Sequence, residues 1–232
     1  MPLQGDVSCS AICCAAVGLA RDPSCRYDSV LGIHHMADQV ARIRIELRRT
    51  KPRIWRRVEV PLSHTLISLH KVIQIAFEWH GGHLFEFEIA GRNFSDPTFN
   101  EYTSPDPFGW DPEDAGKIQL REIVDSGISR FDYTYDFGDD WRHLITILRV
   151  LDAKPDTSYP AFIAGARCPP FEDIGGVWGF YEFVEAAANP NHAGREQYVE
   201  WPGEYVMENF DPEEFDEESI RVGFAALARR IG

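Results

Sequence analysis

The stretch Tyr135–His143 constrains the fold most, because it joins a turn to a strand pattern on each side. Before the turn, aromatic residues alternate with polar ones over residues 131–136. After it, large residues recur at every second position over residues 141–147. Such alternation, rich in aromatic and β-branched side chains, is typical of β-strands. Gly138 offers a positive φ, and Asp side chains beside it can accept hydrogen bonds from turn amides. The stretch predicts a β-hairpin whose second strand, with large residues on both faces, lies centrally in a sheet.

The same turn gathers acidic residues and a histidine, namely Asp136, Asp139, Asp140 and His143. His83, in an earlier segment, is a further candidate ligand. Carboxylate oxygens with imidazole suit Mg²⁺, Mn²⁺ or Zn²⁺, so one interpretation is a divalent metal site. The other is that the acids cap the turn and His143 pairs across the sheet, which turn chemistry alone predicts. No cofactor other than such an ion is expected.

Two earlier strands, expected at residues 40–49 and 54–60, carry a concentration of positive charge. Residues 42–57 hold eight lysines and arginines, and Glu46 is the one acid among them. One interpretation is a nucleic-acid or partner contact, with Trp55 to stack on a base. The other is an outer strand face whose arginines pair with acids elsewhere and discourage edge pairing. The formal net charge of −14 disfavours nucleic acid as the partner. The candidate contact residues are Arg42, Arg44, Arg48, Arg53, Trp55, Arg56 and Arg57.

The remaining elements follow from periodicity and from capping residues. Thr65 is a good N-cap for a helix over residues 66–79, and a strand is expected over 84–89. Residues 91–117 and 154–176 look like long loops, separated by a helical turn at 120–124 and the hairpin. Helices are expected at 179–188, at 195–201 and from Asp211 to the end. These elements predict an α+β fold: a mainly antiparallel, twisted sheet of about five strands, the 66–79 helix on one face and the C-terminal helices at one end.

Residues 1–35 differ from the rest, because they hold four of the five cysteines and show no strand or helix pattern that continues into the body. We expect an unstructured or mis-called N-terminal extension, followed by a single domain over residues 36–232. The cysteine spacing forms no disulfide framework, which is typical of a reducing, cytoplasmic compartment. No stretch reaches the roughly 18 apolar residues of a membrane span, so no membrane association is expected.

Seven segments of the body are distinctive. They are Pro52–Arg57, Leu69–Gln74, His83–Phe87, Tyr135–His143, Cys168–Pro170, Glu172–Gly176 and Phe210–Asp216. In the same order, they resemble those of the plasmid pRiA4b ORF-3-like protein family, and the resemblance covers about residues 40–220. Two features depart from the family pattern: residues 1–35 lie outside it, and Phe171 is inserted after Cys168–Pro170.

The resemblance implies an α+β fold and an association with plasmids or mobile elements, but no established activity. Combined with the residue patterns, it leaves three functions open. The first is a non-enzymatic binding or accessory domain for a partner protein. The second is a metal-dependent enzyme that uses the Asp/His cluster at the hairpin. The third is nucleic-acid binding through the basic strand pair.

Overall fold

The structure, a computed structural model, describes residues 38–98 and 111–231, which lie within one compact unit, Met36–Gly232. The expected extension at residues 1–35 and the middle of the expected 91–117 loop lie outside the described residues. The strands are β1 (Gln39–Leu47), β2 (Trp55–Pro61), β3 (Phe85–Ile89), β4 (Arg92–Ser95), β5 (Glu113–Asp114), β6 (Arg130–Tyr135), β7 (Trp141–Asp152) and β8 (Ala161–Ala166). The helices are α1 (Leu66–Ala76), α2 (Leu120–Asp125), α3 (Gly176–Ala188), α4 (Arg195–Tyr198), α5 (Glu204–Asn209) and α6 (Glu217–Ile231).

One mixed sheet has the strand order β5-β4-β3-β6-β7-β1-β2-β8, and all its pairs are antiparallel except β4–β5. The α+β fold and the mainly antiparallel sheet are confirmed. The expected number of about five strands is too low, because the sheet has eight. The three missed strands, β4, β5 and β8, are short and lie in the stretches expected to be loops. They lie at the two edges of the sheet, and they form because they pair with strands that are already there. Local sequence patterns do not reveal such pairing.

The predicted hairpin is confirmed: β6 pairs with β7 in antiparallel register, and β7 lies centrally between β6 and β1. The expected positive φ at Gly138 is wrong. Asp136 and Asp140 hold that conformation instead, with φ of 54° and 55°. Aspartate tolerates this left-handed region because its short side chain can bond to nearby backbone. Asp136 does so, since its Oδ1 accepts the Gly138 amide at 2.9 Å.

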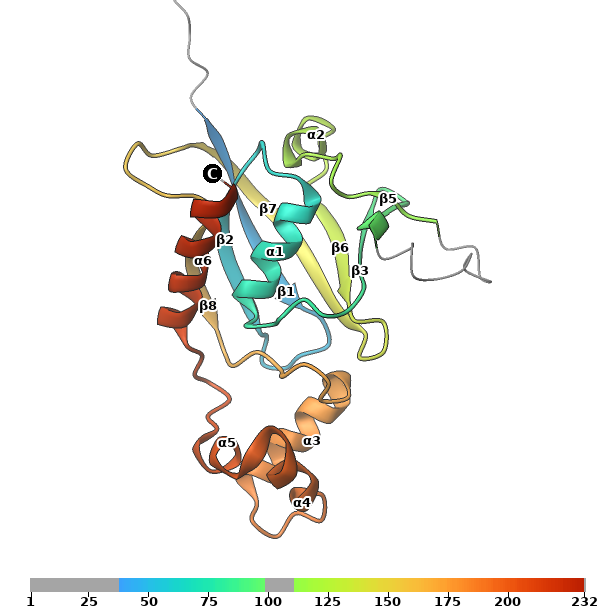
Figure 1. Cartoon of the computed structure of the whole chain (residues 1–232), viewed down its shortest axis with the longest axis vertical. Helices are drawn as coiled ribbons and strands as arrows, with labels where there is room; N and C mark the ends of the chain where they lie inside the picture. Colours follow the sequence, from blue (N-terminus) through green and yellow to red (C-terminus); the bar gives the residue numbers. More distant parts are fainter. Residues whose placement is uncertain (1–37, 99–110, 232) are drawn as a thin grey trace, which may run out of the picture. The chain divides into compact units, whose positions relative to one another are not determined.

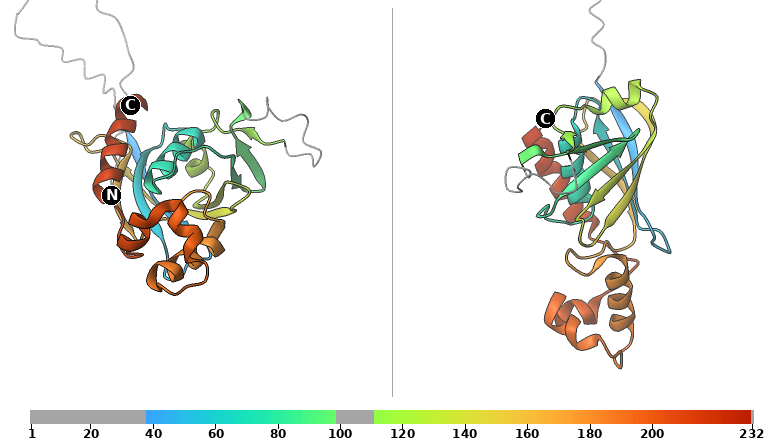
Figure 2. Two further views of the ribbon diagram at one scale, coloured as in Figure 1. Left: turned by 60° about the horizontal axis from the view of Figure 1, so that its bottom comes forward. Right: turned by 90° about the vertical axis from the view of Figure 1, so that its right-hand side faces the viewer.

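The helix α1 lies across one face of the curved sheet (Figures 1 and 2) and buries its apolar stripe there. Thr65 caps it as predicted, because its side chain accepts the Ser68 amide. The last helix, α6, packs beside α1 so closely that a Cβ on Gly223 would lie 2.7 Å from Ile75. This helix begins at Glu217 and not at Asp211. The Ser219 amide donates to Asp216 and not to the earlier acid.

The helices α3, α4 and α5 group beyond the end of the sheet at which the β6–β7 turn lies (Figure 1). They share a small aromatic core, in which Phe183 of α3 contacts Tyr198 and Phe210 with ring centroids 5.5 and 4.7 Å apart. The expected C-terminal helices at one end are therefore present. Among the described residues, no helix is long and apolar enough to cross a membrane.

Two histidines are built into the core between α1 and the sheet. His143 is fully buried, with the rings of Phe77 and Trp79 edge-on to it at 4.8 and 5.4 Å. Burial lowers the pKa of His143 to about 3, although backbone groups at Trp141 and Tyr133 partly oppose this. His70 is also buried, and its Nδ1 lies 2.8 Å from the Tyr133 hydroxyl. Burial, assisted by Lys71, lowers its pKa to about 3 as well.

We predict that His143→Phe makes the stability of the protein less dependent on pH. The pKa of His143 is about 3 when folded and 6.5 ordinarily, so the unfolded chain takes up the proton first as the pH falls. The stability that depends on this neutral imidazole is complete above pH 6.5 and is lost toward pH 3. Between pH 7 and pH 5, His143 contributes about 2 kcal/mol to the loss in the wild type. The variant lacks this contribution but keeps that of His70.

Urea unfolding at the two pH values measures this difference. Ile145→Val, a change on the same face of β7, lowers stability without adding or removing a titratable group and serves as the control. A His143→Phe protein that loses as much stability as wild type between pH 7 and pH 5 would contradict the prediction.

Candidate functional site

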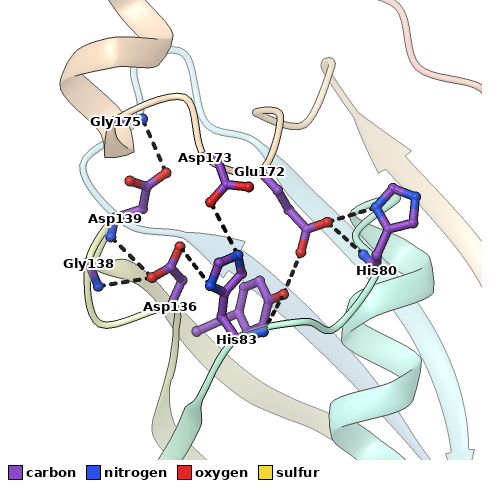
Figure 3. Close-up of polar contacts among 9 residues, drawn as sticks. His80, His83, Asp136, Gly138, Asp139, Glu172, Asp173 and Gly175 are labelled. Atoms are coloured by element: carbon purple, nitrogen blue, oxygen red, sulfur yellow. Dashed lines mark hydrogen bonds and ion pairs between the residues drawn. The ribbon is translucent and has the colours of Figure 1, made fainter.

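Three segments that are distant in sequence meet at the end of the sheet (Figure 3). The first is the link between α1 and β3, residues 80–83. The second is the β6–β7 turn, residues 136–140. The third is the loop before α3, residues 172–176, which we call the acidic loop. Polar side chains from all three segments contact one another, so this is the first candidate site.

Glu172 of the acidic loop is the central residue of these contacts. Its Oε1 accepts a short hydrogen bond from the Tyr135 hydroxyl, and its Oε2 accepts the backbone N–H of His80 at 2.8 Å. The same oxygen lies 2.8 Å from Nδ1 of the His80 ring. Burial alone would raise the pKa of Glu172, but the bonds from Tyr135 and His80 outweigh it and lower that pKa. The pKa of Tyr135 is raised, first by burial and then by Glu172.

His83 lies between two carboxylates. Its Nδ1 is 3.7 Å from Oδ2 of Asp136, and its Nε2 is 3.2 Å from Oδ1 of Asp173. The other oxygen of Asp136 accepts the amides of Gly138 and Asp139 at 2.9 and 3.4 Å. The turn therefore fixes the Asp136 carboxylate so that its second oxygen faces His83 (Figure 3).

Backbone contacts hold the acidic loop against the turn. The Gly175 amide donates to Oδ2 of Asp139 at 3.2 Å. At Gly176, whose φ is 69°, a Cβ would lie 2.5 Å from the Asp139 carbonyl oxygen. Only glycine fits such a close approach at a positive φ. The Gly175–Gly176 pair thus lets the loop reach the turn and place Glu172 and Asp173.

The residues predicted as metal ligands separate in the structure. His83 and Asp136 come together, joined by Asp173, which the sequence did not single out. Asp140 points elsewhere, with Arg142 at 2.6 Å and Arg49 at 3.3 Å. The Asp139 carboxylate accepts a hydrogen bond from the Gly175 amide, and His143 is buried in the core. The acidic pair before two glycines was visible in the sequence, but nothing there linked it to the hairpin.

A groove of about 660 Å³ adjoins the acidic loop and forms the second candidate site; we call it the acidic groove. Its lining is mainly apolar and aromatic and includes four carboxylates but no lysine or arginine. Trp201 is 46% exposed at this groove. The lining residues are Phe77, Glu78, His80, Cys168, Pro169, Pro170, Phe171, Glu172, Asp173, Trp201, Pro202, Val206, Phe215 and Asp216.

The basic strand pair, β1 with β2, holds most of its charge in ion pairs. Arg42 contacts Glu59, its cross-strand neighbour, at 2.5 Å, and Arg48 pairs with Asp132 of β6. Arg44 and Arg53 each lie 3.1 Å from Glu46. Trp55 is covered by two arginines, because the guanidinium carbons of Arg44 and Arg57 lie 4.6 and 5.2 Å from its ring centroid. Of these three acids only Asp132 lies outside the strand pair, so the arginines are paired mainly with acids of β1 and β2 themselves.

Arg56 stands apart from the other candidate contact residues because it is fully buried. Its guanidinium donates four hydrogen bonds to backbone carbonyl oxygens, those of Trp55, Ala76, Ala166 and Arg167. Burial lowers its pKa to about 10, which Glu78 and Cys168 partly offset. Arg56 therefore joins the end of α1 to β2 and β8 and is not part of the protein surface.

We predict that Arg56→Met lowers the free energy of unfolding by at least about 3 kcal/mol, because buried carbonyl oxygens lose their donors. Arg57→Met is the matched control. It removes a half-buried guanidinium stacked on Trp55 and costs less than about 1 kcal/mol. Urea unfolding measures both. Equal losses in the two variants would show that Arg56 has no such structural role.

The comparisons with known proteins agree with this fold. The family described as plasmid pRiA4b ORF-3-like protein matches residues 39–219. The uncharacterized protein y4hQ of Sinorhizobium fredii is 38% identical over 169 residues, which is 72% of this chain and 83% of that protein. The crystal structure of MM3350, a protein of unknown function from Methanosarcina mazei Go1, is similar with a TM-score of 0.67 and 32% identity, and covers 79% of this chain and 97% of that one. This chain belongs to the plasmid pRiA4b ORF-3-like protein family, whose function is unknown.

Proposed function

We propose that this chain is a non-enzymatic binding domain, an accessory module of plasmids or mobile elements, that holds a basic and partly apolar segment of a partner protein. The acidic groove carries the proposal, because it combines four carboxylates and exposed aromatic surface with no lysine or arginine. A chain with a formal net charge of −14 also attracts cationic partners at long range.

The charges at the groove favour a cationic ligand. Glu78, at the rim, makes no hydrogen bond or ion pair through its carboxylate within the described part of the chain. Partial burial raises its pKa, Arg56 opposes this and Asp216 adds to it. A lysine or arginine side chain bound at this rim offsets the repulsion between Glu78 and Asp216. The bound cation also stabilises the ionised form of Glu78, which partial burial in the groove disfavours.

The aromatic lining suits the same ligand. Guanidinium and ammonium groups are attracted to the faces of tryptophan and phenylalanine rings. Phe215 already makes one such cation–π contact within the protein, because the guanidinium carbon of Arg56 lies 4.2 Å from its ring centroid. Trp201, 46% exposed, is the groove's tryptophan and its most suitable anchor for a partner.

Binding fits the groove better than covalent catalysis. Cys168 is the one cysteine in the lining, and burial raises the pKa of its thiol to about 12, with a further contribution from Glu78. Because the thiolate is the nucleophile, a thiol with a raised pKa is unreactive at neutral pH. Its sulfur instead contacts the Pro169 carbonyl oxygen at 3.4 Å.

We predict that the protein binds a short synthetic peptide of alternating arginine and leucine more tightly than a matched peptide of glutamate and leucine. Fluorescence anisotropy measures both affinities, and added salt weakens the first. Trp201→Ala weakens binding of the arginine peptide at least tenfold, about 1.4 kcal/mol. Glu78→Gln weakens it as well, because the rim loses a charge.

Trp178→Ala is the matched control. Trp178 is 85% exposed on α3 but does not line the acidic groove, so its removal leaves the affinity unchanged. If the arginine peptide merely adhered to an acidic protein, Trp201→Ala and Trp178→Ala would behave alike. That result, or equal affinity for the glutamate peptide, would overturn the proposal.

A further inference from the structure

The group formed by His83, Asp136 and Asp173 brings potential metal ligands from the three separate segments into one place. One ligand atom from each residue lies within 4.8 Å of the others. The group mixes an imidazole with two carboxylates, and His83 is the one residue that contacts both acids. It lies beside the acidic groove, because Asp173 also belongs to the groove lining.

Asp136 offers one carboxylate oxygen to a ligand. The residue is only 8% exposed, and its other oxygen accepts the turn amides. The first oxygen makes no hydrogen bond among the described residues, because Nδ1 of His83 lies 3.7 Å away, beyond hydrogen-bonding distance. A metal ion is a strong partner for such a carboxylate oxygen.

The dimensions of the group nearly fit an ion as they stand. Bonds of roughly 2.0–2.2 Å to nitrogen and oxygen place ligand atoms no more than about 4.4 Å apart. The three ligand atoms all lie within 4.8 Å of one another, so they are already near this limit. The Asp173 side chain is 69% exposed and can adjust at little cost, whereas the turn holds Asp136 in place.

The ligand types select the class of ion. Imidazole favours transition metals over Ca²⁺ and Mg²⁺, and carboxylates are ligands of both Mn²⁺ and Zn²⁺. We propose that His83, Asp136 and Asp173 form a site for a divalent transition-metal ion, with Mn²⁺ or Zn²⁺ as the fitting ions. Three protein ligands leave coordination positions for water or for another ligand. The site ties the acidic loop to the β6–β7 turn and does not rest on the peptide-binding proposal.

A competing arrangement uses no metal. A protonated His83 can donate from both ring nitrogens, one toward each carboxylate, and hold the same three residues together. The two arrangements differ in one measurable respect. In the metal site, the His83 imidazole gives up a proton when the ion binds, and the bound ion raises the stability of the protein. In the imidazolium bridge, adding the ion does not change the stability.

The test is a titration of the full chain, stripped with EDTA, with Mn²⁺. This ion is the probe because the four cysteines of residues 1–25 would compete for Zn²⁺. Electron paramagnetic resonance of free Mn²⁺ counts the bound ions, and a thermal unfolding scan measures stabilisation. We expect one bound Mn²⁺ per chain, a raised melting temperature, and no such effect with Ca²⁺.

His83→Ala and Asp173→Asn each weaken Mn²⁺ binding at least about tenfold. Asp173→Asn changes an exposed side chain, so it reports on the site even if His83→Ala disturbs the fold. Asp125→Asn is the matched control for Asp173→Asn, because it removes an exposed carboxylate at the end of α2, outside the group. No binding up to about 1 mM Mn²⁺, or binding that neither variant weakens, would overturn the proposal in favour of the imidazolium bridge.

Discussion

The carboxylate of Glu172 is the contact on which the arrangement of both candidate sites depends. It joins the Tyr135 hydroxyl, at the end of β6, to the His80 backbone, just beyond α1, and it belongs to the loop that leads into α3. Its neighbours in that loop, Cys168–Pro170 on one side and Asp173 on the other, line the groove or face His83. If this link were absent, the acidic loop would be held at the turn mainly by the Gly175 and Gly176 contacts.

The parts of the fold that local pattern determines could be predicted from the sequence. The hairpin, the central place of β7, the strands β1 to β3 and the Thr65-capped helix all follow from period and capping. The missed strand β8 is Ala- and Gly-containing and pairs with β2 about a hundred residues earlier in the chain. Pairing with β2 makes this segment a strand, and the Arg56 guanidinium holds its end by donating to the carbonyl oxygens of Ala166 and Arg167. Both contacts come from distant parts of the chain, so the local sequence does not predict the strand.

For the candidate site, the alternation of side chains along β7 and β2 indicated which residues are buried better than the composition of the β6–β7 turn did. Trp141, His143 and Ile145 share one face of β7, and Arg56 shares its face with Val58, so the period of two already placed both polar residues inward. Burial keeps His143 neutral in the core, and buried Arg56 joins α1 to β8 through hydrogen bonds to backbone carbonyl oxygens. His83 and Asp136 were within reach of sequence reasoning. Asp173 was not, because the contacts that bring it to the hairpin, the Glu172 bonds and the approach of Gly175–Gly176 to Asp139, join segments distant in sequence.

The most direct test of the role of Glu172 is hydrogen–deuterium exchange in Glu172→Ala compared with wild type. If the carboxylate holds the acidic loop, amides of residues 80–83 and 172–176 exchange faster in the variant, while β1 and β7 keep their protection. Glu185→Ala, an exposed change on α3, controls for charge and leaves the pattern unchanged. Unchanged exchange in the acidic loop of Glu172→Ala would contradict the account, because the loop would then be held without this link.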